Sequence, residues 1–184
     1  MGQLSGIQAT KKAIRRPKIA VIGASSAPTE TLESALELGA ALAGEGWHLL
    51  CGGGGGVMEA ACRGFLSVTR SEGQLTIGIL PSDEEEWANP FVELTIPTGL
   101  GLARNAVIAR AADAVVAVGG CSGTLSEMAF SWQMGRPVVA MVNSGGWAET
   151  LGGKAIDDRR NDTVFPAQDA AQAVSFLRSA FEEK

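Results

Sequence analysis

The sequence contains one histidine, His48, and only three cysteines, Cys51, Cys62 and Cys121. These residues form no paired spacing and cannot supply the ligand set of a zinc site or a disulfide framework. We therefore expect no metal site and reduced thiols, as in a cytoplasm. His48 lies beside strand-like residues, and we expect its role to be structural.

Long apolar runs are also missing. No segment reaches the roughly 18 apolar residues that a membrane-spanning helix requires. The first 17 residues are partly basic but lack the apolar segment of a secretory signal. We expect a flexible N-terminal leader over residues 1–17, one domain over residues 18–184, a cytoplasmic location and no membrane partner.

Positive charge is scarce outside this leader. The chain has 15 basic and 20 acidic side chains, a net charge of −5. The remainder of the chain is more acidic than this total, because five basic residues lie among the first 18. An acidic body is a poor electrostatic partner for nucleic acid, so we expect no nucleic-acid binding. The five residues are Lys11, Lys12, Arg15, Arg16 and Lys18.

Apolar, β-branched segments alternate along the chain with segments of helical spacing. The apolar segments show almost no polar alternation, which is typical of strands buried on both faces of a parallel sheet. The pattern predicts an α/β fold, a doubly wound, Rossmann-like parallel sheet with helices on both faces. The predicted strands cover residues 18–26 (running into a loop), 47–53, 74–81, 91–98, 113–120 and 136–144, and the predicted helices cover 28–46, 56–73, 101–112, 122–135 and 167–184.

Glycine-rich loops follow three predicted strands, at residues 23–26, 52–56 and 119–124. Ligands of such sheets bind outside the carboxyl ends of the strands, and helix N-termini offer unpaired N–H groups to anions. We predict that loops 52–56 and 119–124 lie at adjacent strand ends and bind a phosphate in one pocket. The alternative is that the glycines only permit tight turns. The residues assigned to this binding site are Gly23, Ser25, Gly52, Gly53, Gly54, Gly55, Gly56, Gly119, Gly120, Ser122, Gly123 and Thr124.

These loops lack two common nucleotide-binding patterns. No Lys-Ser or Lys-Thr follows the glycines, as the Walker pattern requires, and no acidic residue follows a GxGxxG motif at the expected distance. An enzyme driven by ATP or NAD is therefore disfavoured.

Two charged side chains lie close to the predicted pocket. Arg104 begins a predicted helix at a strand's carboxyl end, where a guanidinium can bind phosphate or sugar hydroxyls. We place Glu127 in the first turn of the next helix, where its carboxylate can stabilise positive charge on a ribose or position water. The alternatives are a surface salt bridge for Arg104 and a helix-dipole carboxylate for Glu127.

The segment GGCSGTLSE at 119–127 resembles the PGGxGTxxE motif of the Lonely Guy family of phosphoribohydrolases, formerly labelled lysine decarboxylase-like. The segment at 104–120 resembles the part of that family that precedes the motif. The resemblance covers residues 18 to 178. It implies that Arg104 and Glu127 are catalytic residues in a hydrolase.

The sequence is similar in further respects to a subgroup that includes the molybdenum cofactor carrier proteins. The shared features are GGGGGVMEAACRG at 52–64, Asn105 after the arginine, and Gly119 where the hydrolases have proline. Cys121 departs from the hydrolase motif by replacing its second glycine. These differences cast doubt on cytokinin-type hydrolysis and leave anion binding intact.

The resemblance implies two functions. The chain could bind a phosphorylated nucleotide-like or pterin-like molecule as a carrier, with the molybdenum cofactor as cargo and no cofactor of its own. It could instead cleave the N-glycosidic bond of a nucleoside 5′-monophosphate to give free base and ribose 5-phosphate. A homodimer or homotetramer is implied in both cases. Lysine decarboxylation is excluded, because Lys154 lies outside every site motif and no other lysine is placed to form a Schiff base.

Overall fold

The computed structural model describes residues 15–182. Residues 1–14, most of the expected leader, lie outside the described residues. Seven strands form a single sheet, and each neighbouring pair is parallel. They are β1 (Lys18–Gly23), β2 (His48–Cys51), β3 (Thr76–Leu80), β4 (Leu94–Pro97), β5 (Ala114–Val118), β6 (Val138–Met141) and β7 (Phe165–Ala167).

The order across the sheet is β4-β3-β2-β1-β5-β6-β7. The chain therefore builds the sheet outward from β1 in one direction and then returns to add β5 on the other side of β1. This confirms the predicted doubly wound parallel sheet, and it places the reversal of strand order between β1 and β5.

Helices connect the strands, and short 3₁₀ turns precede or follow some of them. The α-helices of residues 15–182 are α1 (Thr29–Gly44), α2 (Val57–Leu66), α3 (Arg104–Ala111), α4 (Ser122–Gln133), α5 (Gly146–Leu151) and α6 (Ala170–Glu182). The 3₁₀ turns are η1 (Glu85–Trp87), η2 (Gly101–Ala103) and η3 (Val142–Ser144).

The prediction of six strands was wrong by one, because it missed the edge strand β7. This strand has three residues, one of them Pro166, and is too short to show any periodicity. The strand predicted at 136–144 also ends early, at Met141, where η3 begins.

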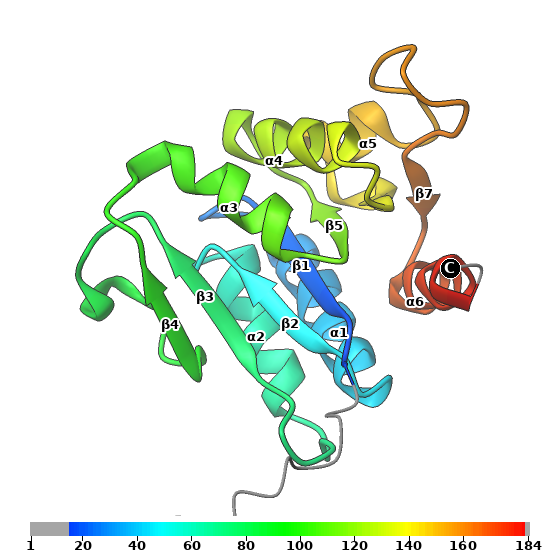
Figure 1. The fold of residues 1–184 in the computed structure, drawn as a ribbon. Helices are drawn as coiled ribbons and strands as arrows, with labels where there is room; N and C mark the ends of the chain where they lie inside the picture. The colour runs from blue at the N-terminus through cyan, green and yellow to red at the C-terminus, as the bar shows by residue number, and fades with distance from the viewer. Residues whose placement is uncertain (1–14, 183–184) are drawn as a thin grey trace, which may run out of the picture.

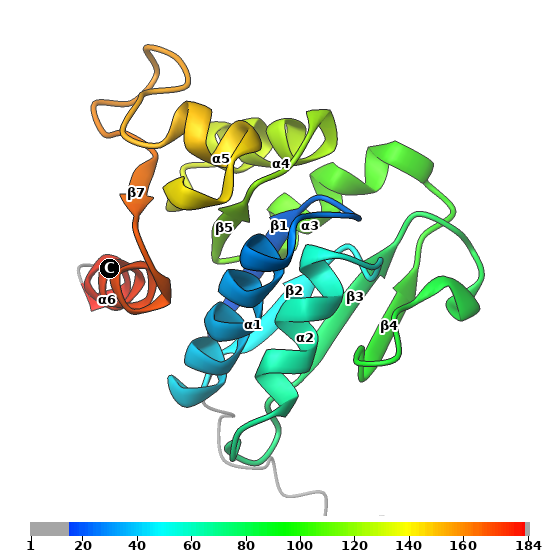
Figure 2. The same cartoon turned by 180° about the vertical axis from the view of Figure 1, so that it is seen from behind.

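The helices lie on both faces of the sheet. Figure 1 shows α3, α4 and α5 against one face, and Figure 2 shows α1 and α2 against the other, where α6 also packs. Alternate residues of β1 enter the two cores, since Val21 packs with α1 and α2 and Ile22 packs with α3 and α4. Both residues are buried, which explains why the sequence of β1 shows no polar alternation.

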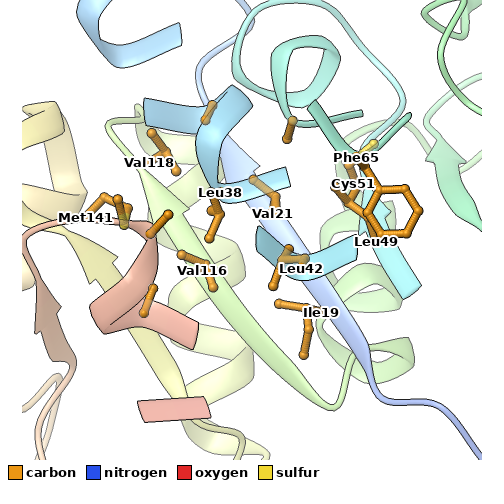
Figure 3. Packing of buried hydrophobic residues seen from close by; sticks show 14 of the residues in the cluster. Ile19, Val21, Leu38, Leu42, Leu49, Cys51, Phe65, Val116, Val118 and Met141 are labelled. Carbon is orange, nitrogen blue, oxygen red and sulfur yellow. The ribbon is translucent and has the colours of Figure 1, made fainter. Parts of the chain in front are cut away.

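The larger core lies between the sheet and α1, α2 and α6. Leu38 and Leu42 of α1 point toward Val21 and Val116 of the sheet (Figure 3), and all four side chains are fully buried. Burial of each leucine contributes about 1.5–3 kcal/mol to folding. This packing holds β1 and β5 in place beneath the loops at their carboxyl ends.

Residues directly before β1 contact the body of the protein. Arg15 Nη2 lies 2.5 Å from Asp113 Oδ1, and Arg16 donates hydrogen bonds to the carbonyl oxygens of Gly46 and Glu72. Among residues 15–182, no helix is both long enough and apolar enough to cross a bilayer.

Candidate functional site

A pocket of about 320 Å³ opens at the carboxyl ends of β1 and β5, where the strand order reverses. In open α/β sheets this crevice is the usual position for a ligand. Three loops and the start of α3 surround the pocket. Its lining residues are Ile22, Gly23, Ala24, Ser25, Ser26, Gly52, Met58, Leu102, Arg104, Asn105, Cys121, Gly123, Thr124 and Glu127.

Half of the residues assigned to the site from sequence line this pocket. As predicted, the two glycine loops border one pocket. The prediction that they follow adjacent strands is wrong, because β1 lies between β2 and β5. The predicted residues that line the pocket are Gly23, Ser25, Gly52, Arg104, Gly123, Thr124 and Glu127, and those that do not are Gly53, Gly54, Gly55, Gly56, Gly119, Gly120 and Ser122.

Contacts within the protein account for most of the glycine run at 52–56. A Cβ on Gly52 would lie 2.5 Å from Arg104 Nη1, so the bare backbone makes room for this guanidinium. Gly56 has a φ of +64°, and a Cβ there would lie 2.4 Å from the carbonyl carbon of Ser25. The next residue, Val57, donates its N–H to the carbonyl of Ala24. The run therefore packs the start of α2 against the loop that follows β1.

The loop after β5 is held by the segment that follows β6. The Gly119 N–H donates to Ser144 Oγ over 2.6 Å, and the Gly119 and Gly120 carbonyls accept from the N–H groups of Ala148 and Trp147. These bonds fix the chain direction just before α4, so that this helix starts at the pocket.

The first turn of α4 faces the pocket with unused hydrogen-bond donors. Its first amide groups have no partner within the helix, and no side chain caps them. Thr124 is only 3% exposed and lines the pocket, and its hydroxyl has no hydrogen-bond partner among the described residues. Free amides, a hydroxyl and the positive end of a helix dipole are groups that can bind an anion.

Arg104 and Glu127 form an ion pair in the wall of the pocket. Arg104 Nη1 lies 3.2 Å from Glu127 Oε1, and their side chains are 15% and 8% exposed. Burial raises the pKa of Glu127 to about 7, and the positive charge of Arg104 limits this rise. The carboxyl group can therefore hold or release a proton near neutral pH.

The structure corrects the position assigned to Glu127. It is the sixth residue of α4 and lies in the second turn, not the first. The helix dipole acts mainly within the first turn, so Arg104 is the main stabilising partner of this carboxylate. Arg104 begins α3, as predicted, and its ion pair is largely buried, unlike a surface salt bridge.

Sequence reasoning missed four apolar pocket residues, including Met58 and Leu102. Met58 follows the glycine run, and Leu102 belongs to η2 and is 86% exposed although it lines the pocket. Leu102 had a usable signal, because it is a large apolar residue in a glycine-rich loop. Asn105 is 7% exposed and donates to Ser126 Oγ, which links α3 to α4.

His48, Cys51 and Cys62 do not line this pocket. His48 Nδ1 accepts a hydrogen bond from the Leu75 N–H, which is a structural contact. Cys51 and Cys62 are buried, with their sulfur atoms 3.7 Å apart. Residues 15–182 contain no cluster of three or more His, Cys, Asp or Glu side chains that could hold a metal ion.

The fold and the pocket define a Rossmann-like α/β protein with a pocket at the point of strand reversal. Comparison with known families is more specific. The SLOG cluster4 family matches residues 16–174, and the chain belongs to this family. The predicted kinship with Lonely Guy-like proteins is thereby confirmed.

Relatives of two kinds are similar to this chain. A cytokinin riboside 5′-monophosphate phosphoribohydrolase of Mycobacterium tuberculosis is 34% identical over 136 residues, which cover 70% of this chain and 71% of that protein. The molybdenum cofactor binding protein of Rippkaea orientalis has a TM-score of 0.77 and 33% identity, over 92% of this chain and 99% of that one. The molybdenum cofactor carrier protein of Chlamydomonas reinhardtii has a TM-score of 0.71 and 31% identity, over 91% and 99%.

A more distant structure shares the fold alone. DNA processing protein A of Helicobacter pylori has a TM-score of 0.62 but only 17% identity, over 89% of this chain and 81% of that one. This level of similarity carries no argument about what the present chain binds.

Proposed function

We propose that this protein binds a phosphorylated pterin-like or nucleotide-like small molecule and acts as a carrier, with the molybdenum cofactor as its cargo. One observation carries the proposal. The free amides of α4, the unpartnered hydroxyl of Thr124 and the guanidinium of Arg104 all border one pocket. This donor set suits a phosphate group, because it combines positive charge with several N–H and O–H donors.

The other pocket residues suit the organic part of such a ligand. Met58, Leu102 and Ile22 provide apolar surface beside the polar donors. A flat heterocycle with a phosphate at one end has a matching division between apolar and charged parts. The similarity to cofactor-binding and carrier proteins over most of the chain supports this assignment of cargo.

Hydrolysis of a nucleoside 5′-monophosphate is the second candidate, and the Arg104–Glu127 pair is the observation that favours it. Arg104 would hold the phosphate or ribose, and the Glu127 carboxylate would stabilise the positive charge that develops on the ribose during cleavage. The phosphoribohydrolase relative supports this reading.

The ligand that copurifies with the protein distinguishes the two candidates. We expect freshly purified protein to release a molybdopterin on denaturation, identified by mass spectrometry. We expect no free adenine after incubation of the protein with AMP. Release of adenine from AMP, and its loss in Glu127→Gln, would overturn the carrier role in favour of the hydrolase. A protein that binds neither AMP nor a molybdopterin would contradict both.

We further propose that the chain forms a homodimer or homotetramer in the cytoplasm. Five large apolar side chains are exposed between residues 87 and 102, around the edge strand β4 and η2. Pairing of copies would remove this apolar surface from water. Light scattering that shows a monomer at high concentration would contradict the proposal. The five residues are Trp87, Leu94, Ile96, Leu100 and Leu102.

A further inference from the structure

Cys121 differs from the other two cysteines in its surroundings. It is exposed and lines the pocket, whereas Cys51 and Cys62 are buried in the core. It directly precedes α4, and its side chain makes no capping hydrogen bond with that helix. Cys121 is therefore an exposed cysteine on the pocket wall, at the position that precedes the first turn of the helix.

A second feature of the pocket points to an anionic ligand beside this thiol. The Thr124 hydroxyl, on a side chain that is almost fully buried, has no partner among the described residues. The charged groups that face the pocket are Arg104 and its ion-pair partner Glu127. With the free amides of α4, these groups allow an anion to settle within reach of the sulfur.

We propose that Cys121 is a modification site that undergoes thiol–disulfide exchange with small disulfides carrying carboxylate groups. The Cys121 thiolate attacks one sulfur of the disulfide, whose S–S bond breaks as a new S–S bond forms to Cys121. The other half leaves as a thiolate and takes up a proton from water, so no further oxidant is needed. The amides of α4 and Arg104 bind the carboxylates of the attached half.

This modification fills the anion site. The attached group occupies the space beside Gly123 and Thr124, so a phosphorylated ligand can no longer reach the amides of α4. The loss of ligand binding rests on the proposed function, but the selective reaction of Cys121 does not. Reduction of the mixed disulfide restores the pocket.

The test compares two disulfides on the full-length protein by intact-mass spectrometry. Oxidised glutathione is anionic and bis(2-hydroxyethyl) disulfide is neutral. For each disulfide, the rate of its reaction with the protein is divided by the rate of its reaction with free cysteine. We expect a single adduct per chain, formed about tenfold faster with the anionic probe on this normalised scale. Inorganic phosphate should slow the reaction, and Cys121→Ser should abolish it.

Arg104→Ala tests the pocket and should lower the rate with oxidised glutathione more than the rate with the neutral disulfide. Arg110→Ala, an exposed position on the same helix outside the pocket, is the matched control and should change neither rate. Equal normalised rates for the two probes, or an adduct on Cys51 or Cys62 in the folded protein, would overturn the proposal. If the anionic probe reacts selectively but no phosphorylated ligand binds the unmodified protein, the proposed function fails and the modification site stands.

Discussion

The two glycine loops, 52–56 and 119–124, are similar in sequence but differ in what their backbones contact. The run at 52–56 packs against the protein itself, at the Arg104 guanidinium and the backbone of Ser25, and contributes only Gly52 to the pocket. The loop at 119–124 leads into α4 and brings Gly123 and Thr124 to the pocket.

The difference shows that a bare backbone does not by itself indicate a ligand. Contacts within the protein explain the glycines at 52 and 56, and phosphate binding stays a prediction for the glycines that line the pocket. Gly56 permits a tight turn and a close approach of two chain segments, whereas Gly123 belongs to a helix N-terminus that lines the pocket, and a Cβ there would lie 3.7 Å from Asn105 Nδ2. Substitutions in each loop can separate these roles.

The largest expected effect is on folding, from Gly56→Ala. Its positive φ and the 2.4 Å approach to Ser25 would impose both backbone strain and a steric clash. We expect a loss of roughly 3–5 kcal/mol in the free energy of unfolding, measured by urea denaturation. Gly55→Ala is the matched control, because the nearest atom to its Cβ would be at 3.6 Å. If Gly55→Ala keeps its stability but loses affinity for ligand, the run does face the ligand and the comparison fails.

The next effect concerns the pH dependence of stability and Glu127. Its pKa rises from 4.5 to about 7 on folding, so between these values the folded state holds a proton that the unfolded state has released. The stability that this bound proton gives the folded state is fully present below pH 4.5. As the pH rises to 7, the free energy of unfolding falls by about 3 kcal/mol.

Glu127→Gln should remove this loss, because the amide stays neutral at every pH. We expect urea denaturation at pH 5, 6, 7 and 8 to show the variant gaining stability relative to the original chain as the pH rises. Burial and nearby positive charge lower the pKa of His48, so its titration changes stability with pH in the opposite direction. This effect is the same in both proteins and cancels in the difference between their free energies of unfolding. A difference that does not change with pH would contradict the raised pKa.

A smaller effect is expected on ligand affinity from Arg104→Ala. Loss of a charge-assisted contact should weaken binding of the phosphorylated ligand about 10- to 100-fold, measured by calorimetric titration. Arg110→Ala, an exposed position on the same helix, serves as the control and should leave affinity unchanged. Unchanged binding in Arg104→Ala would remove the guanidinium from the anion site.

The smallest effect should distinguish two hydroxyls at the start of α4. Thr124→Val keeps the shape of the side chain but removes its unpartnered hydroxyl, and should weaken binding about fivefold, or about 1 kcal/mol. Ser122→Ala should have no effect, since Ser122 is exposed and does not line the pocket. The reverse order of effects would mean that the ligand lies outside the pocket, on the solvent side of the helix.

The sequence by itself determined the parallel α/β fold, because strands buried on both faces must be apolar at nearly every position. It also selected Arg104 and Glu127, which lie within recognisable motifs and which the structure pairs in the pocket wall, and their functional roles stay predictions. It missed β7, since a three-residue edge strand containing proline has no periodicity to detect. These successes and failures follow from how far a local pattern extends along the chain.

Only the tertiary structure decided which glycines face the pocket and which face the protein. The contacts of Gly52 with Arg104 and of Gly56 with Ser25 join segments that are distant in sequence, so no local pattern encodes them. The same holds for Glu127. Its pairing with Arg104 and its raised pKa arise from burial between α3 and α4, and the free energy of a buried charge depends on every group packed around it.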